Sequence, residues 1–419
     1  MELRFFYDVV CPYAYLASTR VEAMAARTGA SVRWIPILLG GLFREVDAPA
    51  NPSALMNPAK ARHNLLDMRR WADLWSVPLS MPAAHPRRTV AAMRLCVAAD
   101  DATRPALSQA LFRAYWADGE DVADRAVLDR IARAHGLDPA VIDGDAAREG
   151  LFASTREAAR AGAFGVPAFV VGEHLFWGQD RMHLVEAALG GPVRSQLDGA
   201  PLRRDRSDRP RVRFFHDYAS PFSYLAATQI DALAAARGLE VAWTPILLGA
   251  LFRSIGTPDV PLFTMSENKR RYVARDLDDW ARALGVPYQF PSRFPLRSVL
   301  PLRVTLVEPA AASHLYRAYW AEDQAIDDPE TLAAVLTAAG FDAATLLERS
   351  QAPAIKAALR QNTEEAEAAA VFGVPTVEVS YPGAAPLLFW GQDRLTLAAA
   401  AMDGWIPAGE GAPDPSGVV

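Results

Sequence analysis

The feature that most constrains this chain is a repeat of domain length. The phrase "FFYDVVCPYAYLA", which begins at Phe5, returns as "FFHDYASPFSYLA" from Phe214. The segment "VRWIPILLGGLFR" from Val32 returns as "VAWTPILLGALFR" from Val241, and "FWGQDR" closes both copies. Solenoid repeats are only about 20–50 residues long, so a repeat of this length predicts a duplicated domain.

The positions of the matching segments predict the domain organisation. We expect a first domain at 1–190, a linker at 191–210, a second domain at 211–405 and a flexible tail at 406–419. The linker is rich in Gly, Pro and charged residues, which is typical of a solvated connection. A chain of 419 residues is long enough to bury two sizeable cores.

Composition limits the partners and the compartment. The net charge of −6 argues against nucleic acid as the main partner. Cys11 and Cys96 are the only cysteines, which excludes a disulfide framework and a zinc site built from cysteines. The first residues lack the apolar core of a signal peptide, and no apolar run approaches membrane-spanning length. We therefore expect a soluble cytoplasmic protein without a metal or a membrane partner.

The pattern within one copy predicts the order of its elements. "LRFFYD" predicts a strand, and a helical pattern follows from Pro12 to Gly29. "VRWIPILL" predicts a second strand, a long helical stretch follows, and "PAFVV" with "HLFW" predicts a hairpin before a closing helix. The fold class is therefore α/β, with two thioredoxin-like domains that each carry an inserted helical domain.

Cys11 and Ser220 occupy the same strand-to-helix turn in the two copies. A helix start stabilises an anion, so we expect a cysteine there to have a depressed pKa. A dithiol oxidoreductase needs Cys-x-x-Cys, but Ala14 and Ser223 stand at the resolving position. We expect Cys96, which matches Thr305, to lie on a buried helix face. The chemistry therefore favours a thiol supplied from outside the chain.

Several blocks, in the same order in both copies, carry a family resemblance. They are F-x-x-D-x-x-S-P-x-x-Y-L from Phe214, P-I-L-L-G-x-L-F from Pro245, "NKRRYVARDL" from Asn268, "FGVP" and "WGQDR". Each copy resembles the 2-hydroxychromene-2-carboxylate isomerases and the kappa-class glutathione transferases, in the DsbA-like branch of the thioredoxin superfamily.

The resemblance implies a glutathione site in each copy. In the second copy, Ser220 would hydrogen-bond the glutathione thiolate and Lys269 would bind the glycyl carboxylate. Val374, before a cis-proline at Pro375, would pair with the cysteinyl part, and Asp393 with Arg394 would hold the γ-glutamyl end. The matches in the first copy are Cys11, Lys60, Val166, Pro167, Asp180 and Arg181.

Simpler roles are open for several of these residues. The two lysines could be solvated helix charges, and the two Asp-Arg pairs could be helix caps. The family also places an asparagine before the lysine, where this chain offers Thr257, or Asn51 after a shift. We expect Asp8 and Asp217 to fix the active-site turn.

The resemblance implies a glutathione-dependent isomerase that acts on an aromatic or conjugated small molecule through the glutathione thiolate. The two copies would pack as an intramolecular pseudo-dimer, with further oligomerisation open. The alternatives are a kappa-class-like glutathione transferase, a monothiol thiol-disulfide oxidoreductase using Cys11, and a non-catalytic glutathione-binding protein.

Overall fold

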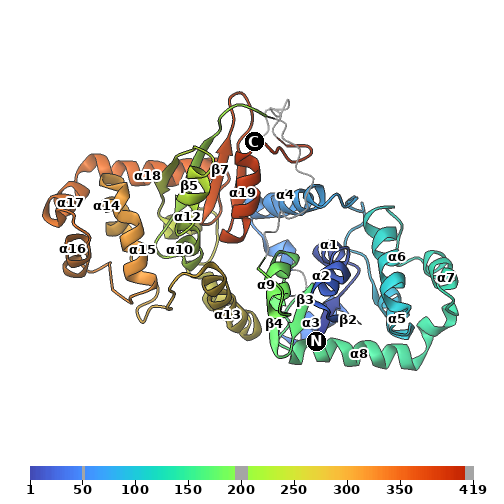
Figure 1. Ribbon diagram of the computed structural model, residues 1–419. Coiled ribbons are helices and arrows are strands. Elements are labelled where there is room, and N and C mark those ends of the chain that lie inside the picture. Colours follow the sequence, from blue (N-terminus) through green and yellow to red (C-terminus); the bar gives the residue numbers. More distant parts are fainter. Residues whose placement is uncertain (50–51, 194–205, 411–419) are drawn as a thin grey trace. The chain divides into compact units, whose positions relative to one another are not determined.

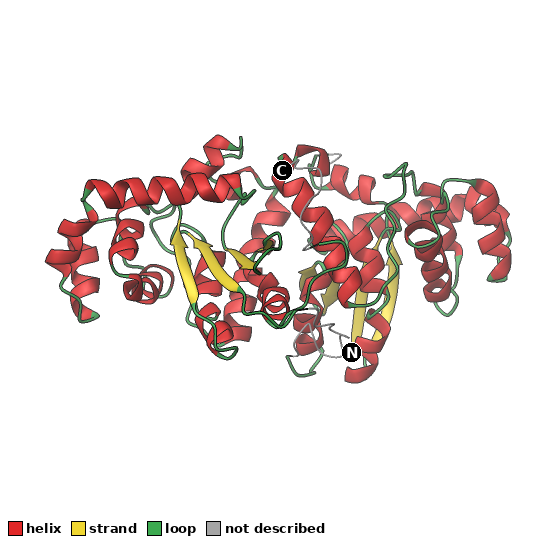
Figure 2. Ribbon diagram, turned by 90° about the horizontal axis from the view of Figure 1, so that it is seen from above, coloured by secondary structure: helices red, strands yellow, loops and turns green. Residues whose placement is uncertain are grey.

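The computed structural model describes residues 1–49, 52–193 and 206–410. Within these residues, each repeat forms one four-stranded mixed sheet with helices packed around it (Figures 1 and 2). The α/β fold with two thioredoxin-like domains is thus confirmed. The central part of the expected linker, 194–205, and the end of the expected tail, 411–419, lie outside the described residues.

The sheet of the first repeat has the strand order β2-β1-β3-β4. Its strands are β1 (Glu2–Tyr7), β2 (Ser31–Pro36), β3 (Ala168–Val171) and β4 (His174–Trp177). β1 runs parallel to β2 and antiparallel to β3, which forms the predicted hairpin with β4. Phe5, Phe6 and Tyr7 are fully buried, so β1 lies at the centre of the core.

The helices of the first repeat lie between and after its strands. α1 and α2 connect β1 to β2, and α3 to α8 lie between β2 and β3; α9 follows the hairpin and closes the repeat. Their bounds are α1 (Pro12–Ser18), α2 (Val21–Thr28), α3 (Leu39–Glu45), η1 (Pro52–Leu55), α4 (Pro58–Leu74), α5 (Val90–Ala98), α6 (Arg104–Trp116), α7 (Arg125–Ala134), η2 (Pro139–Asp143), α8 (Asp145–Arg160), η3 (Gln179–Arg181) and α9 (Met182–Ala188).

The second repeat has the same topology, with the strand order β6-β5-β7-β8. Its strands are β5 (Arg211–His216), β6 (Val241–Pro245), β7 (Thr376–Ser380) and β8 (Leu387–Trp390). Its helices are α10 (Pro221–Ala227), α11 (Ile230–Ala235), α12 (Leu248–Ser254), η4 (Pro261–Thr264), α13 (Glu267–Leu284), α14 (Val299–Val307), η5 (Pro309–Ala311), α15 (Ala312–Trp320), α16 (Pro329–Ala338), α17 (Ala343–Ser350), α18 (Pro353–Ala368), η6 (Gln392–Arg394) and α19 (Leu395–Met402).

The helix expected from Pro12 to Gly29 is broken into α1 and α2. The hydroxyls of Ser18 and Thr19 donate to the carbonyls of Tyr15 and Leu16, at 2.6 and 2.7 Å. Such local bonds compete with the helix backbone and favour its interruption. The second helix ends where predicted, because Gly29 adopts φ 69°, a conformation that favours glycine at a helix end.

The chain forms two compact units that do not follow the repeats throughout. Unit 1 consists of most of the first repeat together with Met265–Asp276 from the second. Unit 2 consists of most of the second repeat together with Asn57–His63 from the first. Each unit therefore takes in the beginning of one long helix, α4 or α13, from the other repeat.

No helix in the described part of the chain is long and apolar enough to cross a membrane.

Candidate functional site

The turn before α10 positions Ser220. This residue has extended backbone angles and caps α10, because its Oγ accepts a hydrogen bond from the Ser223 amide at 3.2 Å. The same Oγ donates to the main-chain carbonyl of Val374 at 3.1 Å. Only 5% of the Ser220 surface is exposed. The hydroxyl is thus held on the loop that precedes β7.

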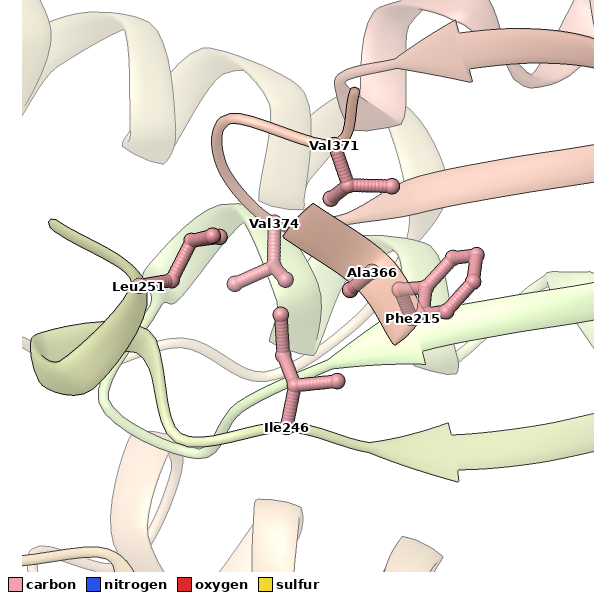
Figure 3. Close-up of a cluster of buried hydrophobic side chains, with 6 residues drawn as sticks. All are labelled: Phe215, Ile246, Leu251, Ala366, Val371 and Val374. Carbon is pink, nitrogen blue, oxygen red and sulfur yellow. The ribbon is translucent and has the colours of Figure 1, made fainter. Parts of the chain in front are cut away.

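This loop contains the cis bond between Val374 and Pro375, as the resemblance implied. Val374 belongs to a buried apolar cluster with Phe215, Ile246, Leu251, Ala366 and Val371 (Figure 3). The carbonyl of Pro375 accepts a hydrogen bond from the Gly391 amide at 2.9 Å. Apolar packing and this backbone bond together fix the carbonyl that faces Ser220.

Asp393 and Arg394 come two and three residues after Gly391, whose amide donates to the Pro375 carbonyl. Arg394 Nη1 lies 3.2 Å from Asp393 Oδ2. Gly391 adopts φ 108°, and a Cβ there would come within 2.3 Å of the Asp393 carboxylate, so glycine is required. Arg181 and Arg394 occupy the N-cap positions of α9 and α19, and their side chains make no capping hydrogen bond.

A buried aspartate fixes the turn in each repeat, as expected. Asp217 accepts hydrogen bonds from the amides of Ala219 at 2.9 Å and Leu248 at 2.8 Å. Burial raises the pKa of its carboxyl to about 6. Asp8 accepts the equivalent bonds from Val10 and Leu39, and burial raises its pKa as well.

The turn of the first repeat has the same geometry around Cys11. Its Sγ donates to the carbonyl of Val166 at 3.1 Å, and the bond from Val166 to Pro167 is also cis. The Gly178 amide donates to Pro167, and Arg181 lies 3.0 Å from the Asp180 carboxylate.

The expected low pKa of the Cys11 thiol is wrong in this structure. Burial raises its pKa to about 12, although the amides of Ala14 and Tyr13 favour the anion. Cys11 is 8% exposed, so loss of hydration outweighs the two amides. Cys96 is fully buried within α5, as predicted from its sequence context.

A second ionic cluster lies in unit 1. Two guanidinium nitrogens of Arg181, Nε and Nη2, donate to the two carboxylate oxygens of Asp276, at 3.0 and 2.9 Å. Tyr272 donates a further bond of 3.0 Å to the same carboxylate. Sequence reasoning assigned no role to Asp276 or Tyr272. The repetition of Asp276 as Asp67 was the available signal.

Matching the repeats paired Lys269 with Ser220 and Lys60 with Cys11, whereas the compact units contain the opposite combinations. Lys269 lies in unit 1, where its Nζ is 6.0 Å from the centre of the Trp177 ring. Lys60 lies in unit 2, 5.4 Å from the centre of the Trp390 ring. Ser220 belongs to unit 2 as well. Lys60 is therefore the lysine that shares a compact unit with Ser220.

The Lys60 ammonium is partly desolvated. Burial lowers its pKa, and no carboxylate in the described part of the chain forms an ion pair with it. The interpretation as a freely solvated helix charge is therefore wrong for this lysine. Thr257 donates its amide to the Phe252 carbonyl, whereas Asn51 lies outside the described residues.

These features define a class of protein. A β-α-β start, a polar side chain at the first turn and a cis-proline loop facing it are those of a thioredoxin-like domain, here present twice. The chain belongs to the DSBA-like thioredoxin domain family, which it matches at residues 2–190 and 211–403.

Its relatives are about half its length. The 2-hydroxychromene-2-carboxylate isomerase of Pseudomonas sp. (strain C18) is 29% identical over 199 residues, which are 46% of this chain and 92% of the relative. Glutathione S-transferase kappa 1 of Caenorhabditis elegans is 26% identical over 207 residues, 45% of this chain and 90% of the relative. A solved 2-hydroxychromene-2-carboxylate isomerase aligns with a TM-score of 0.42 at 25% identity, over 45% of this chain and 95% of that one.

Proposed function

We propose that this chain is a glutathione-dependent isomerase of the 2-hydroxychromene-2-carboxylate isomerase type, with Ser220 at its main site. The contact between the Ser220 hydroxyl and the Val374 carbonyl carries the proposal. It places one hydroxyl donor beside the main chain of the cis-proline loop. The relatives of this chain include isomerases of this name.

The residues present fit a bound tripeptide thiol. The main chain of Val374 would pair with the cysteinyl backbone, and Asp393 with Arg394 would hold the γ-glutamyl end. Lys60 fits the glycyl carboxylate, because its ammonium is partly desolvated and forms no ion pair within the described residues. A carboxylate placed there would compensate the cost of burying that charge.

Binding would also change the role of Ser220. A glutathione thiolate placed beside the Ser220 hydroxyl would compete with the neutral Val374 carbonyl as its acceptor, because hydrogen bonds to ionised acceptors are stronger. A hydrogen bond to a charged acceptor contributes about 1.5–3 kcal/mol. That is about one to two units of thiol pKa at 1.36 kcal/mol per unit. Glutathione, when bound, supplies the thiolate nucleophile that adds to a conjugated carbon of the substrate and leaves again after isomerisation.

The repeat arrangement supports a pseudo-dimer. Each compact unit takes in a helical segment from the other repeat, so neither repeat makes up a unit alone. We therefore propose that the two repeats act as the two halves of a dimer, with Lys60 at the Ser220 site and Lys269 at the Cys11 site.

The test is an isomerisation assay on 2-hydroxychromene-2-carboxylate with and without glutathione, together with calorimetric titration of glutathione. We expect turnover that requires glutathione. Binding without turnover on chromene carboxylates would instead favour a non-catalytic binding protein, and an absence of binding would refute both.

A second candidate is a kappa-class-like glutathione transferase, favoured by the similarity to glutathione S-transferase kappa 1. It predicts a stable conjugate between glutathione and an aromatic halide, which the isomerase reaction does not leave. A monothiol oxidoreductase using Cys11 is disfavoured, because a thiol with a pKa of about 12 is almost wholly protonated at neutral pH.

A further inference from the structure

The segment 286–298 of unit 2, called here the aromatic loop, is fixed to the Ser220 turn at both ends. The Tyr224 hydroxyl, from α10, donates to the carbonyl of Pro287. At the other end, the Ser298 side chain hydrogen-bonds the Asp217 carboxylate. The amide of Gln289 donates to the Trp320 carbonyl at 2.7 Å. The loop is therefore held in place beside the turn that carries Ser220.

Three phenylalanines form a continuous apolar surface on and beside this loop. Phe290 and Phe263, from η4, are 42% and 62% exposed. Phe294 lies between them, with ring centres 5.0 Å from Phe290 and 6.3 Å from Phe263. Contiguous apolar side chains exposed on a surface often mark ligand-binding sites.

Trp320 connects this surface to the active-site turn. Its ring centre lies 6.0 Å from Phe290 and 6.3 Å from Phe294. Its indole Nε1 donates to the carbonyl of Tyr218, two residues before Ser220, at 2.8 Å. The exposed rings thus continue inward to a ring that contacts the turn itself.

The first repeat keeps this framework but not the phenylalanines. Trp116 donates to the Val9 carbonyl at 2.8 Å, as Trp320 does to Tyr218. Matching the repeats places Ala54, Met81 and His85 where the second repeat has Phe263, Phe290 and Phe294. His85 packs at 5.1 Å from the Trp116 ring, and its Nδ1 lies 3.0 Å from the Tyr115 hydroxyl.

We propose that Phe263, Phe290 and Phe294 form the surface that receives the planar aromatic ring system of the substrate at the Ser220 site. This inference rests on the proposed function and adds the residues that would contact the substrate ring and the repeat that carries them. Aromatic rings pack edge-to-face and offset-stacked with a preference beyond their area, and three neighbouring phenylalanines offer a planar ligand both modes. The first repeat, with Ala54, Met81 and His85, lacks this surface and discriminates against bicyclic aromatic substrates.

The test measures binding directly, so that it does not depend on turnover. The probe is chromone-2-carboxylate, a planar bicyclic acid, titrated by calorimetry against the full chain saturated with glutathione. The variants are Phe290→Ala and Phe263→Ala, both at exposed positions where folding is not at risk. Phe152→Ala is the matched control, because Phe152 is a phenylalanine of similar exposure, 51%, on α8 of the first repeat.

We expect each test variant to weaken probe binding about tenfold, the loss of an aromatic contact of about 1.4 kcal/mol. Affinity for glutathione should stay within twofold in all three. The double substitution Met81→Phe with His85→Phe should add a second probe equivalent per chain.

Two results would overturn the inference: no probe binding by the unmodified chain, or equal affinity in Phe290→Ala, Phe263→Ala and Phe152→Ala. Failure of the proposed function is separate, because it would appear as a loss of glutathione binding or of glutathione-dependent turnover in the unmodified chain.

Discussion

The ammonium of Lys60, in the first repeat, lies 5.4 Å from the ring centre of Trp390, in the second. Trp390 directly precedes Gly391, whose amide bonds the carbonyl of the cis-proline Pro375. A lysine of one repeat therefore lies beside the cis-proline loop of the other. Lys269 and Trp177 repeat the relationship in unit 1, at 6.0 Å.

This relationship predicts which lysine serves which site. Lys60→Ala should raise the KM for glutathione in the isomerase assay by about tenfold or more, as expected for the loss of a charged hydrogen bond of about 1.5–3 kcal/mol. The kcat should change little, because a lysine that binds the glycyl carboxylate, far from the sulfur, contributes to binding and not to the chemical step.

Lys269→Ala is the matched control and should leave that KM within about twofold. The reverse result, a raised KM in Lys269→Ala and a normal one in Lys60→Ala, would restore the pairing expected from matching the repeats.

Ser220→Ala tests the hydroxyl itself. The substitution leaves the loop packing around Val374 in place but removes the donor that would face the glutathione thiolate. We expect turnover to fall about a hundredfold, in the range of a lost anion-stabilising donor. Steady-state kinetics and a thermal melt measure it, and a stable variant with full turnover would show that Ser220 is not catalytic.

The order of the elements was predictable because local signals mark their ends. Pro12 begins a helix after the first strand, and Gly29 ends one. The exchange of lysines between units was not predictable. α4 and α13 have no interior Gly or Pro, so nothing in their sequences shows where one compact unit stops. That boundary is set by tertiary contacts alone.

The electrostatics of the turn were predicted less well than its position. A cysteine at a helix start suggests a low pKa, and the sequence around Cys11 gave no sign against it. In the structure, burial raises this pKa instead. The burial that raises its pKa depends on residues far away in the chain, such as Val166, which accepts its hydrogen bond. The paired motifs located the turn, but they carried no information on its solvation.

Asp217 predicts a dependence of stability on pH. Its folded-state pKa, about 6, is raised above the ordinary value of 3.8. The stability that comes from keeping this carboxyl protonated in the folded state is therefore fully present below pH 3.8. It is lost as pH rises through 6. Asp217→Asn should flatten the fall in the free energy of unfolding across this window. Urea titrations at several pH values measure it, and parallel curves for the two proteins would contradict the buried, proton-binding role.

His216 predicts the opposite trend over a neighbouring range. Burial lowers its pKa from 6.5 to about 3, and its Nε2 has no hydrogen-bond partner. The contribution of the neutral imidazole is therefore present above pH 6.5 and is lost as pH falls toward 3. His216→Phe should reduce the acid-induced loss of stability, measured by the same titrations. An unchanged acid limb would mean that His216 takes up its proton without unfolding.

The last prediction concerns the thiol at the turn of the first repeat. With a pKa of about 12, Cys11 holds a negligible thiolate fraction at neutral pH, and the thiolate is the reactive form. In the native chain we therefore expect alkylation by iodoacetamide to be far slower than that of free cysteine.

Because the Ser220 site is proposed to carry the isomerase reaction, Cys11→Ala should leave most turnover intact. Titration should still give two glutathione equivalents per chain, since Lys269, Asp180, Arg181 and the cis-proline loop remain in unit 1. Rapid alkylation accompanied by loss of turnover, or a dead Cys11→Ala variant, would instead assign the chemistry to the first repeat.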